Sequence, residues 1–274
     1  MTLSLNTDGI SIFKSSNKSI WPIFLTINEL PLSERFKISN TVLAAIYCAP
    51  SKPNFSILLE PLISDLKKLE VQGIQLIGLS HKCFIFLTCI CADKPARCQL
   101  TNTVQFDGRH GCLYCYDEGK SENRKWVYPQ SGEHCQRIHE HHSKIIEKNN
   151  FPSYGIKGVC AFQKLRFINF FSSFPIDYMH GSLLGVGKNL IHRIFSKQFK
   201  SLSYSLHGHL SEIDRKILNI KLPKYVPRNV SSLSLIEKWK ANEIRSFFYT
   251  YGIHAFPCFN RDRYLKYLLA SLLF

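Results

Sequence analysis

The chain has 274 residues, 45% of them hydrophobic and 13% aromatic, which excludes an intrinsically disordered protein and suffices for one large domain or two small ones. Lys and Arg outnumber Asp and Glu by 35 to 20, giving a formal charge of +15. That charge favours a polyanionic partner, most simply DNA or another nucleic acid, with general solubility or attraction to anionic lipid as alternatives. No apolar run reaches the roughly 18 residues of a membrane span, and no signal peptide is visible, so we expect an intracellular protein without a membrane partner.

The first third of the chain predicts strand, strand, strand, helix, strand. Apolar and β-branched patterns place strands at 3–13, with a kink at Gly9, and at 20–27 and 41–48. Helical spacing follows over 54–71, and further strands are expected at 74–79 and 83–91. This is the order of a ribonuclease-H-like α/β core, a mixed sheet flanked by helices. In such a core the first strand lies beside the strand that follows the first helix.

Each of these two strands carries an acid. Asp8 lies in the first strand, and Asp93 ends the apolar run 83–91. Two facing carboxylates repel each other unless cations lie between them. The sequence therefore predicts a pair of Mg²⁺ or Mn²⁺ ions, roughly 4 Å apart, that clamp a phosphodiester. The alternative for Asp93 is a capping residue for a helix that begins near Pro95.

A third acid is needed to complete such a site. Glu243 is the first candidate, on a predicted helix whose apolar face comprises Trp239, Ile244, Phe247, Phe248 and Tyr251. Asp177, in the segment 174–180, is the second candidate. The alternative for Glu243 is an exposed helix residue without a catalytic role.

The stretch between Asp93 and Glu243 is longer than a bare core requires. We therefore expect residues 1–98 to form the first part of the core, 99–235 a mostly helical insertion, and 236–274 the C-terminal catalytic helix, cut short. Apolar patterns predict helices over 183–195 and 210–218, and a further one over 264–274. The insertion contains a Cys-x-x-Cys turn followed by a cluster of histidines. A structural Zn²⁺ held by Cys112, Cys115, His139 and His142 is one interpretation. A redox pair of cysteines, or surface histidines without a ligand role, are the others.

Short segments over nearly the whole chain carry a common resemblance. They are Asn6–Ser16 with Ile20–Ile23, Ala92–Arg97, Gly111–Cys115, Asp177–His180 with Leu183–Val186, and Trp239–Arg245. In this order they resemble the transposase domain of CACTA (En/Spm-type) elements.

The resemblance implies a DDE-type cut-and-paste transposase with a ribonuclease-H-like core that acts on DNA in the nucleus. Asp8 and Asp93 would be the first two metal-binding acids, and Glu243, or else Asp177, the third. The metal ions would activate water, and later a freed 3′-hydroxyl, for in-line attack on DNA. Two alternatives remain: a non-catalytic DNA- or protein-binding module, which could self-associate, and a zinc-stabilised interaction protein in which the acids are incidental.

Overall fold

The chain divides into two units, residues 1–176 and 177–274, which are described separately below. The structure, a computed structural model, describes residues 1–11, 18–128, 135–224, 226 and 229–252. The predicted boundaries at residues 98 and 235 are not tested by this division and stay predictions. The apolar C-terminal segment Tyr264–Phe274, predicted as a helix, lies outside the described residues.

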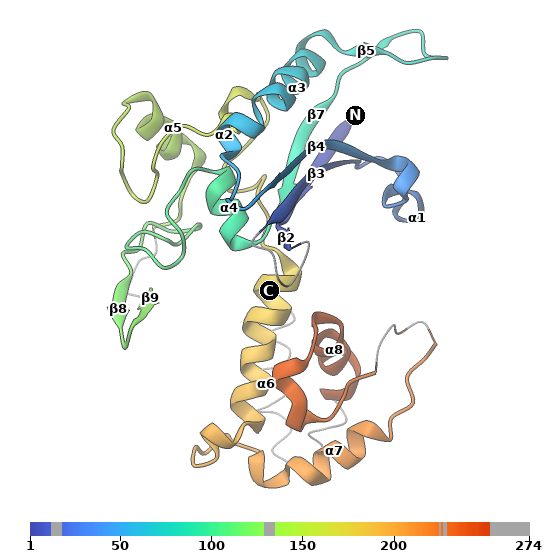
Figure 1. The fold of residues 1–274 in the computed structure, drawn as a ribbon, viewed down its shortest axis with the longest axis vertical. Helices are drawn as coiled ribbons and strands as arrows, with labels where there is room; N and C mark the ends of the chain where they lie inside the picture. The colour runs from blue at the N-terminus through green and yellow to red at the C-terminus, as the bar shows by residue number, and fades with distance from the viewer. Residues whose placement is uncertain (12–17, 129–134, 225, 227–228, 253–274) are drawn as a thin grey trace. The chain divides into compact units, whose positions relative to one another are not determined.

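A five-stranded mixed sheet is the centre of the first unit (Figure 1). β3 pairs antiparallel with β1 and β2 along one edge and with β4 along the other. β1 also pairs with β7, and this pairing is parallel. The prediction that the first strand lies beside the strand after the helix is therefore confirmed, as is the α/β character of the fold. The strands of the sheet are β1 (Thr2–Thr7), β2 (Ile10–Ser11), β3 (Ser19–Ile27), β4 (Thr41–Ala49) and β7 (Phe86–Cys91).

Three predicted strands differ from the structure in their bounds, and one of them, predicted at 74–79, is a strand only at Ile74–Gln75. The predicted kink at Gly9 is a full break between β1 and β2, at a point where a Cβ atom would lie 2.5 Å from the Trp21 ring. The apolar run 83–91 joins the sheet only from Phe86 onward. The Ile85 N–H donates to the Leu69 carbonyl at 3.3 Å instead, and Lys82–Cys83 (β6) pairs with Ile74–Gln75 (β5).

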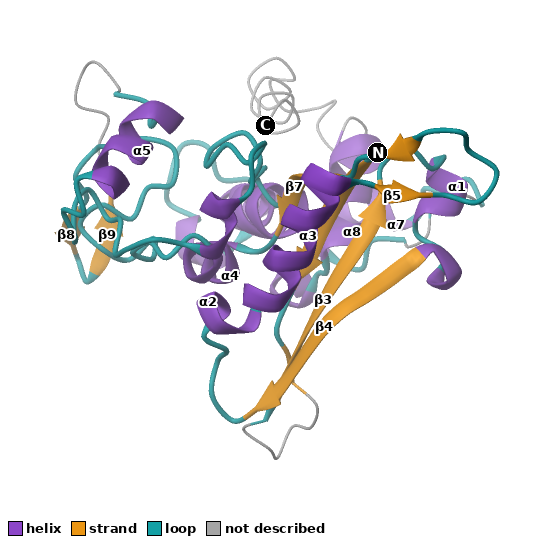
Figure 2. Ribbon diagram, turned by 90° about the horizontal axis from the view of Figure 1, so that it is seen from above, coloured by secondary structure: helices purple, strands orange, loops and turns teal. Residues whose placement is uncertain are grey.

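Helices α2 (Phe55–Leu58) and α3 (Glu60–Gln72) cover one face of this sheet (Figure 2). The Asn54 side chain accepts from the Ser56 N–H at the start of α2, and Gly73, at φ +62°, ends α3. Apolar residues of β1, β3 and β7, of both helices and of the junction between the helices form one buried cluster: Leu5, Ile23, Phe55, Leu59, Ile63, Leu66 and Leu87. The remaining elements of this unit are α1 (Leu32–Arg35), α4 (Lys94–Leu100), β8 (Lys120–Glu122), β9 (Lys125–Val127), α5 (His139–Glu147) and short 3₁₀ turns at Ile38–Asn40 and Ala161–Lys164.

β4 differs from the other strands of the sheet in its exposure. Within the described residues it pairs only with β3, and it contains no charged side chain. Val42, Leu43 and Ile46 are each more than half exposed, at 55%, 53% and 57%. One apolar edge of the sheet is thus left open among the residues described.

The second unit is helical in its described part. A π-helical segment (Tyr178–Gly187) runs into α6 (Lys188–Phe195), and α8 (Ala241–Ser246) runs into a second π-helical segment (Phe247–Tyr251). The helix predicted from 183 begins five residues earlier because Asp177 caps it. Both predicted apolar patterns in this unit are confirmed: α7 spans Leu210–Leu218, and the face listed above around Glu243 is buried. Short 3₁₀ turns lie at Lys197–Phe199, His207–His209 and Leu233–Lys238.

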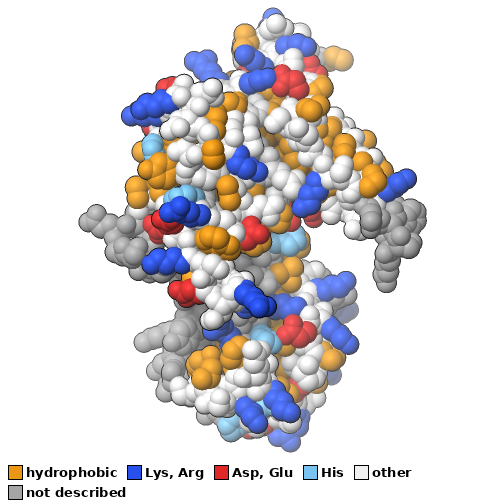
Figure 3. Space-filling model, turned by 60° about the vertical axis from the view of Figure 1, so that its left-hand side comes forward, with side chains coloured by type: hydrophobic (Ala, Val, Ile, Leu, Met, Phe, Trp, Pro, Cys, Tyr) orange, Lys and Arg blue, Asp and Glu red, His pale blue; other side chains and the backbone are white. Residues whose placement is uncertain are grey.

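Positive charge is found on both units. By sequence the second unit carries fifteen Lys and Arg against six Asp and Glu, and the first unit twenty against fourteen. Figure 3 shows Lys and Arg spread over the visible face rather than gathered in one patch. Among the residues that the structure describes, no helix is both long and apolar enough to cross a bilayer.

Candidate functional site

The parallel pairing of β1 with β7 brings Asp8 and Asp93 to the same end of two neighbouring strands. Asn6 pairs with Cys91, and each acid lies two residues beyond that pair. The Asn6 side chain donates to the Cys91 carbonyl at 3.2 Å, which joins the strands again at this end. Asp8 is exposed and Asp93 is half-buried, so both residues reach solvent at the C-terminal ends of β1 and β7.

Asp93 is also the capping residue of α4, so the alternative given for it is confirmed. Its Oδ1 accepts from the Ala96 N–H at 2.7 Å, and Pro95 occupies the first turn of the helix. The cap uses one oxygen, and in the described part of the chain Oδ2 has no hydrogen-bond partner. Asp8 is arranged in the same way, since its Oδ1 accepts from the Gly9 N–H at 2.7 Å. Local backbone contacts therefore hold both side chains, and among the described residues the second oxygen of each carboxylate has no hydrogen-bond partner.

Glu243 is buried at 7% exposure, and it is not the exposed residue that the alternative described. Its Oε1 accepts from the Ser231 Oγ at 2.8 Å, and its Oε2 accepts from the Lys240 N–H at 3.0 Å. The second bond closes the N-terminus of α8. The carboxylate thus ties the segment before the helix to its first turn.

Asp177 has a different environment at the start of the π-helical segment. Its Oδ1 accepts from the Met179 and His180 N–H groups at 2.8 and 3.2 Å, and its Oδ2 lies 2.5 Å from the His180 Nδ1. The His180 side chain is 38% exposed. Sequence reasoning missed this Asp–His pair, although a spacing of three residues before an apolar helix is a signal that could have found it.

The four predicted zinc ligands are not assembled. Cys112 and Cys115 contact one another, and burial, with the hydrogen bond to Cys112 adding to it, raises the pKa of Cys115 to about 12. His142 is buried and stacks on Phe170 with ring centroids 3.9 Å apart. His139 points its Nδ1 at the Phe170 N–H, at 3.4 Å. In the described ranges no three residues among His, Cys, Asp and Glu are grouped so that they could hold a metal ion. The predicted set therefore does not fit a tetrahedral zinc centre as it stands.

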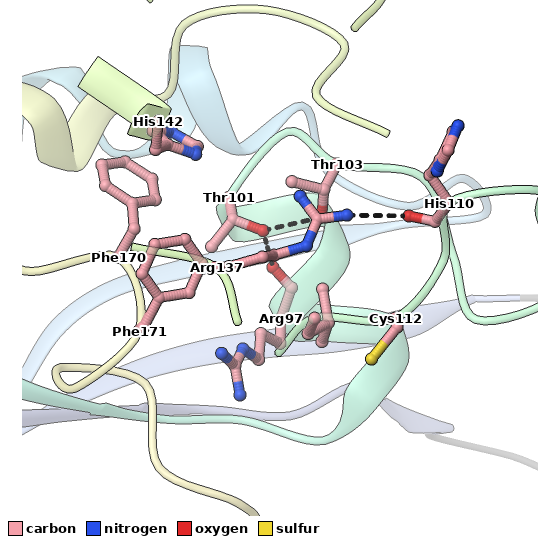
Figure 4. A pocket seen from close by; sticks show the side chains of 10 residues that line it. Arg97, Thr101, Thr103, His110, Cys112, Arg137, His142, Phe170 and Phe171 are labelled. Atoms are coloured by element: carbon pink, nitrogen blue, oxygen red, sulfur yellow. Dashed lines mark hydrogen bonds between the residues drawn. The ribbon is translucent and has the colours of Figure 1, made fainter. Parts of the chain in front are cut away.

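A small cavity in the first unit contains two arginines that sequence reasoning missed (Figure 4). Arg97, on α4, and Arg137, which precedes α5, are only 4% and 8% exposed. Cys112 and His142 line the same cavity. The position of Arg97 in α4, among the buried Ala96, Cys98 and Leu100, was the available signal, because an arginine on an apolar helix face is rarely without a partner.

The first unit is thus of the α/β class, with a mixed sheet in which Asp8 and Asp93 follow the ends of two neighbouring strands. The sequence profile of the transposase family tnp2 matches residues 1–153, so the chain belongs to this family. The match includes Asp8, Asp93 and the Cys-x-x-Cys turn, whereas Asp177 and Glu243 lie beyond it. None of the curated proteins matches the chain.

Proposed function

We propose that the chain is the catalytic part of a DDE-type transposase, which cuts DNA and transfers the cut strand in a metal-dependent reaction. The observation that carries the proposal is the placement of Asp8 and Asp93 at one end of two parallel, adjacent strands. That placement is what a ribonuclease-H-like core requires, and membership of the tnp2 transposase family supports the same class of reaction.

The two acids fit Mg²⁺ or Mn²⁺ because the pair offers oxygen donors alone, the ligand chemistry that these ions prefer. When bound, the metal ions would supply charge neutralisation and an activated oxygen nucleophile. The chain's own contribution is positional. The α4 cap holds Asp93, and the Gly9 N–H holds Asp8, each with one oxygen left free in the described structure.

Glu243 remains the third acid that we propose, and Asp177 the alternative. Both oxygens of Glu243 accept hydrogen bonds inside its own unit. Asp177 is likewise bound by its helix and by His180. Because each has a structural role, only activity measurements matched with stability measurements can tell which one serves the reaction.

DNA is the proposed partner. The formal charge of +15 and the excess of Lys and Arg on both units support it, as does the transposase family. A nuclear location and self-association are further proposals that accompany this function.

The second candidate function is a DNA- or protein-binding module without turnover. The capping role of Asp93 favours it, because a cap accounts for an aspartate there with no metal involved. Only the first candidate predicts strand cleavage. Salt-sensitive DNA binding is expected from the first candidate and from a DNA-binding module, whereas a protein-binding module does not require it.

The test is nicking of a short DNA duplex with Mn²⁺ or Mg²⁺. Asp93→Asn separates the two roles of Asp93, because the amide oxygen of Asn can still cap α4 while the substitution removes the negative charge. We expect Asp8→Asn and Asp93→Asn to abolish nicking with a change in stability below about 0.5 kcal/mol, whereas Asp93→Ala should also lose about 1 kcal/mol.

Asp65→Asn is the matched control, since Asp65 is an exposed helix residue of the same unit, 2.9 Å from Lys68. It should keep full activity. Wild-type protein that binds DNA but never nicks it would favour the binding module, and nicking that survives Asp93→Asn would remove the catalytic assignment.

A structural zinc is retained only as a proposal for the Cys112–Cys115 pair, with His139 and His142 as the ligands that the sequence suggests. No step of the reaction depends on it. Zinc measured by plasma mass spectrometry should fall in Cys112→Ser, and an unchanged zinc content would end this proposal.

A further inference from the structure

A cavity of about 390 Å³ lies within the second unit, on the exposed side of α8. Part of its lining comes from Asn242, Arg245 and Tyr249, which follow one another at spacings of three and four residues and so share one exposed face of α8 and the π-helical segment after it. Pro223 and Val226 supply lining from a separate turn, in which the Val226 N–H donates to the Pro223 carbonyl at 3.0 Å. The volume is typical of small-molecule sites, which measure about 300–1,000 Å³.

The cavity presents an aromatic ring together with a positive charge. Tyr249 lines it and is still 54% exposed, and the Tyr178 hydroxyl lies 3.4 Å from the Tyr249 hydroxyl, which anchors that end of the ring. The Arg245 guanidinium carbon lies 6.0 Å from the centre of the same ring. None of the described lining residues is Asp or Glu, and Lys224, which follows the lining residue Pro223, is exposed. A flat group that carries a negative charge therefore finds a ring to stack on and a cation to pair with.

Two polar side chains of the lining make no hydrogen bond to any other described residue. Asn242 offers an amide donor and an amide acceptor, and Thr250 offers a hydroxyl group. Amide and hydroxyl groups bind the edges of an unpaired base, whereas a guanidinium binds phosphate. The lining thus contains the donor, the acceptor, the ring and the cation that together bind a nucleotide.

We propose that this cavity binds one unpaired nucleotide, whose base stacks on Tyr249 while its phosphate pairs with Arg245. A base inside a duplex does not reach the ring, because both of its faces are stacked on neighbouring base pairs. An unpaired base exposes a face, and aromatic side chains bind such faces with little dependence on sequence. Asn242 and Thr250 contact the edge of the base. A strand of DNA is the source that the proposed function supplies, and only this choice of source rests on that function.

The test is the binding of fluorescein-labelled single strands of about 12 nucleotides to the full chain, measured by fluorescence anisotropy. EDTA is present throughout, so that no cleavage takes place. One strand is oligothymidine, and the other is an abasic strand with the same number of phosphates, so the comparison isolates the contribution of the bases. The wild type should bind oligothymidine about 5–150-fold more tightly than the abasic strand, which is the range that the stacking of one base supplies.

Tyr249→Leu is the decisive variant, because it removes the ring at an exposed position where the loss should leave the fold intact. It should bind the two strands with similar affinity, whereas Tyr249→Phe should keep the preference of the wild type, since a base stacks on either ring. Trp126→Leu is the matched control, because Trp126 is an exposed aromatic residue of the other unit, outside the cavity. It should also keep the preference.

Arg245→Met tests the phosphate contact. It should weaken the binding of both strands and reduce the slope of log K against log salt by about 0.7, the value for one phosphate contact on a single strand. Arg215→Met is the matched control, because Arg215 is an exposed arginine of α7 outside the cavity. It should leave the slope as it is in the wild type.

Either of two results would overturn the proposal. One is a wild type that binds the two strands equally or binds neither. The other is an undiminished preference for oligothymidine in Tyr249→Leu, which would place the bases elsewhere. Displacement of oligothymidine by micromolar deoxythymidine monophosphate would assign the site to a free nucleotide, and its absence would assign the site to the DNA strand. These measurements need no metal ion, so failure here leaves the proposed catalytic function untouched, and a protein that never cleaves DNA can still show the preference.

Discussion

Replacing Glu243 with Ala should destabilise the second unit by about 3 kcal/mol. The side chain is 7% exposed and accepts bonds from the Ser231 hydroxyl and the Lys240 N–H at 2.8 and 3.0 Å. A hydrogen bond to a charged group contributes about 1.5–3 kcal/mol, and the donors left behind in a buried site add to the loss. Glu243→Gln keeps one acceptor oxygen and should cost about 1–2 kcal/mol.

Urea unfolding monitored by hydrogen exchange of peptides around residues 230–251 would measure the loss of unfolding free energy in the segment that contains Glu243. Glu212→Gln is the control, because Glu212 forms a solvent-screened pair with Lys216 at 2.7 Å in the same unit, so its unfolding midpoint should stay close to that of the wild type. Full stability of Glu243→Ala would refute the role as a structural tie. Loss of DNA nicking without loss of stability in Glu243→Gln would instead assign the residue to the reaction.

Three further predictions test other parts of the molecule. Burial lowers the pKa of His142 to about 4 from 6.5, so the unfolded state takes up a proton at a higher pH than the folded state does. The free energy of unfolding should therefore be at its full value above pH 6.5 and fall by about 3 kcal/mol toward pH 4. A pH profile of His142→Asn identical to that of the wild type would contradict this. Gly187→Ala would put a Cβ atom 2.6 Å from the Phe248 ring, and it should lower the free energy of unfolding of the second unit by about 1–3 kcal/mol, measured by urea unfolding. An unchanged unfolding midpoint would show that the ring moves aside freely. Leu87→Ala, at a fully buried sheet position, should cost about 2–5 kcal/mol by the same assay, and a loss below 1 kcal/mol would show that the site collapses around the smaller side chain.

Local patterns predicted the elements of this protein well. Alternation and apolar runs located β3 and β4 almost to the residue, and helical spacing located α7. The strand order then followed from the sequence of elements, which is why the adjacency of the strands before Asp8 and Asp93 was predictable. The elements themselves depend on residues close together in the chain, whereas the adjacency of β1 and β7 was predicted from the order of the elements.

Side-chain contacts between residues distant in the chain were not predictable. The capping partner of Asp93 lies three residues away and was foreseen, whereas the Ser231 partner of Glu243 lies twelve residues away and was not. The zinc prediction grouped cysteines and histidines by spacing, but spacing does not determine whether side chains converge. The apolar neighbours of Arg97 in α4 were a signal of its burial, but its contacts with Tyr114 and Phe174 depend on tertiary structure.

The open edge at β4 has a practical consequence for work on this protein. Along the nine uncharged residues of β4, the backbone N–H and C=O groups on the side away from β3 pair with no other strand in the described structure, and they lie next to exposed Val42, Leu43 and Ile46. Such an edge recruits strands from other molecules, and natural proteins commonly guard against this with a lysine or a proline. Concentrated or slowly refolded samples should therefore form intermolecular sheet. Ile46→Lys would place a gatekeeper charge in the middle of the strand and raise the concentration at which the protein can be handled.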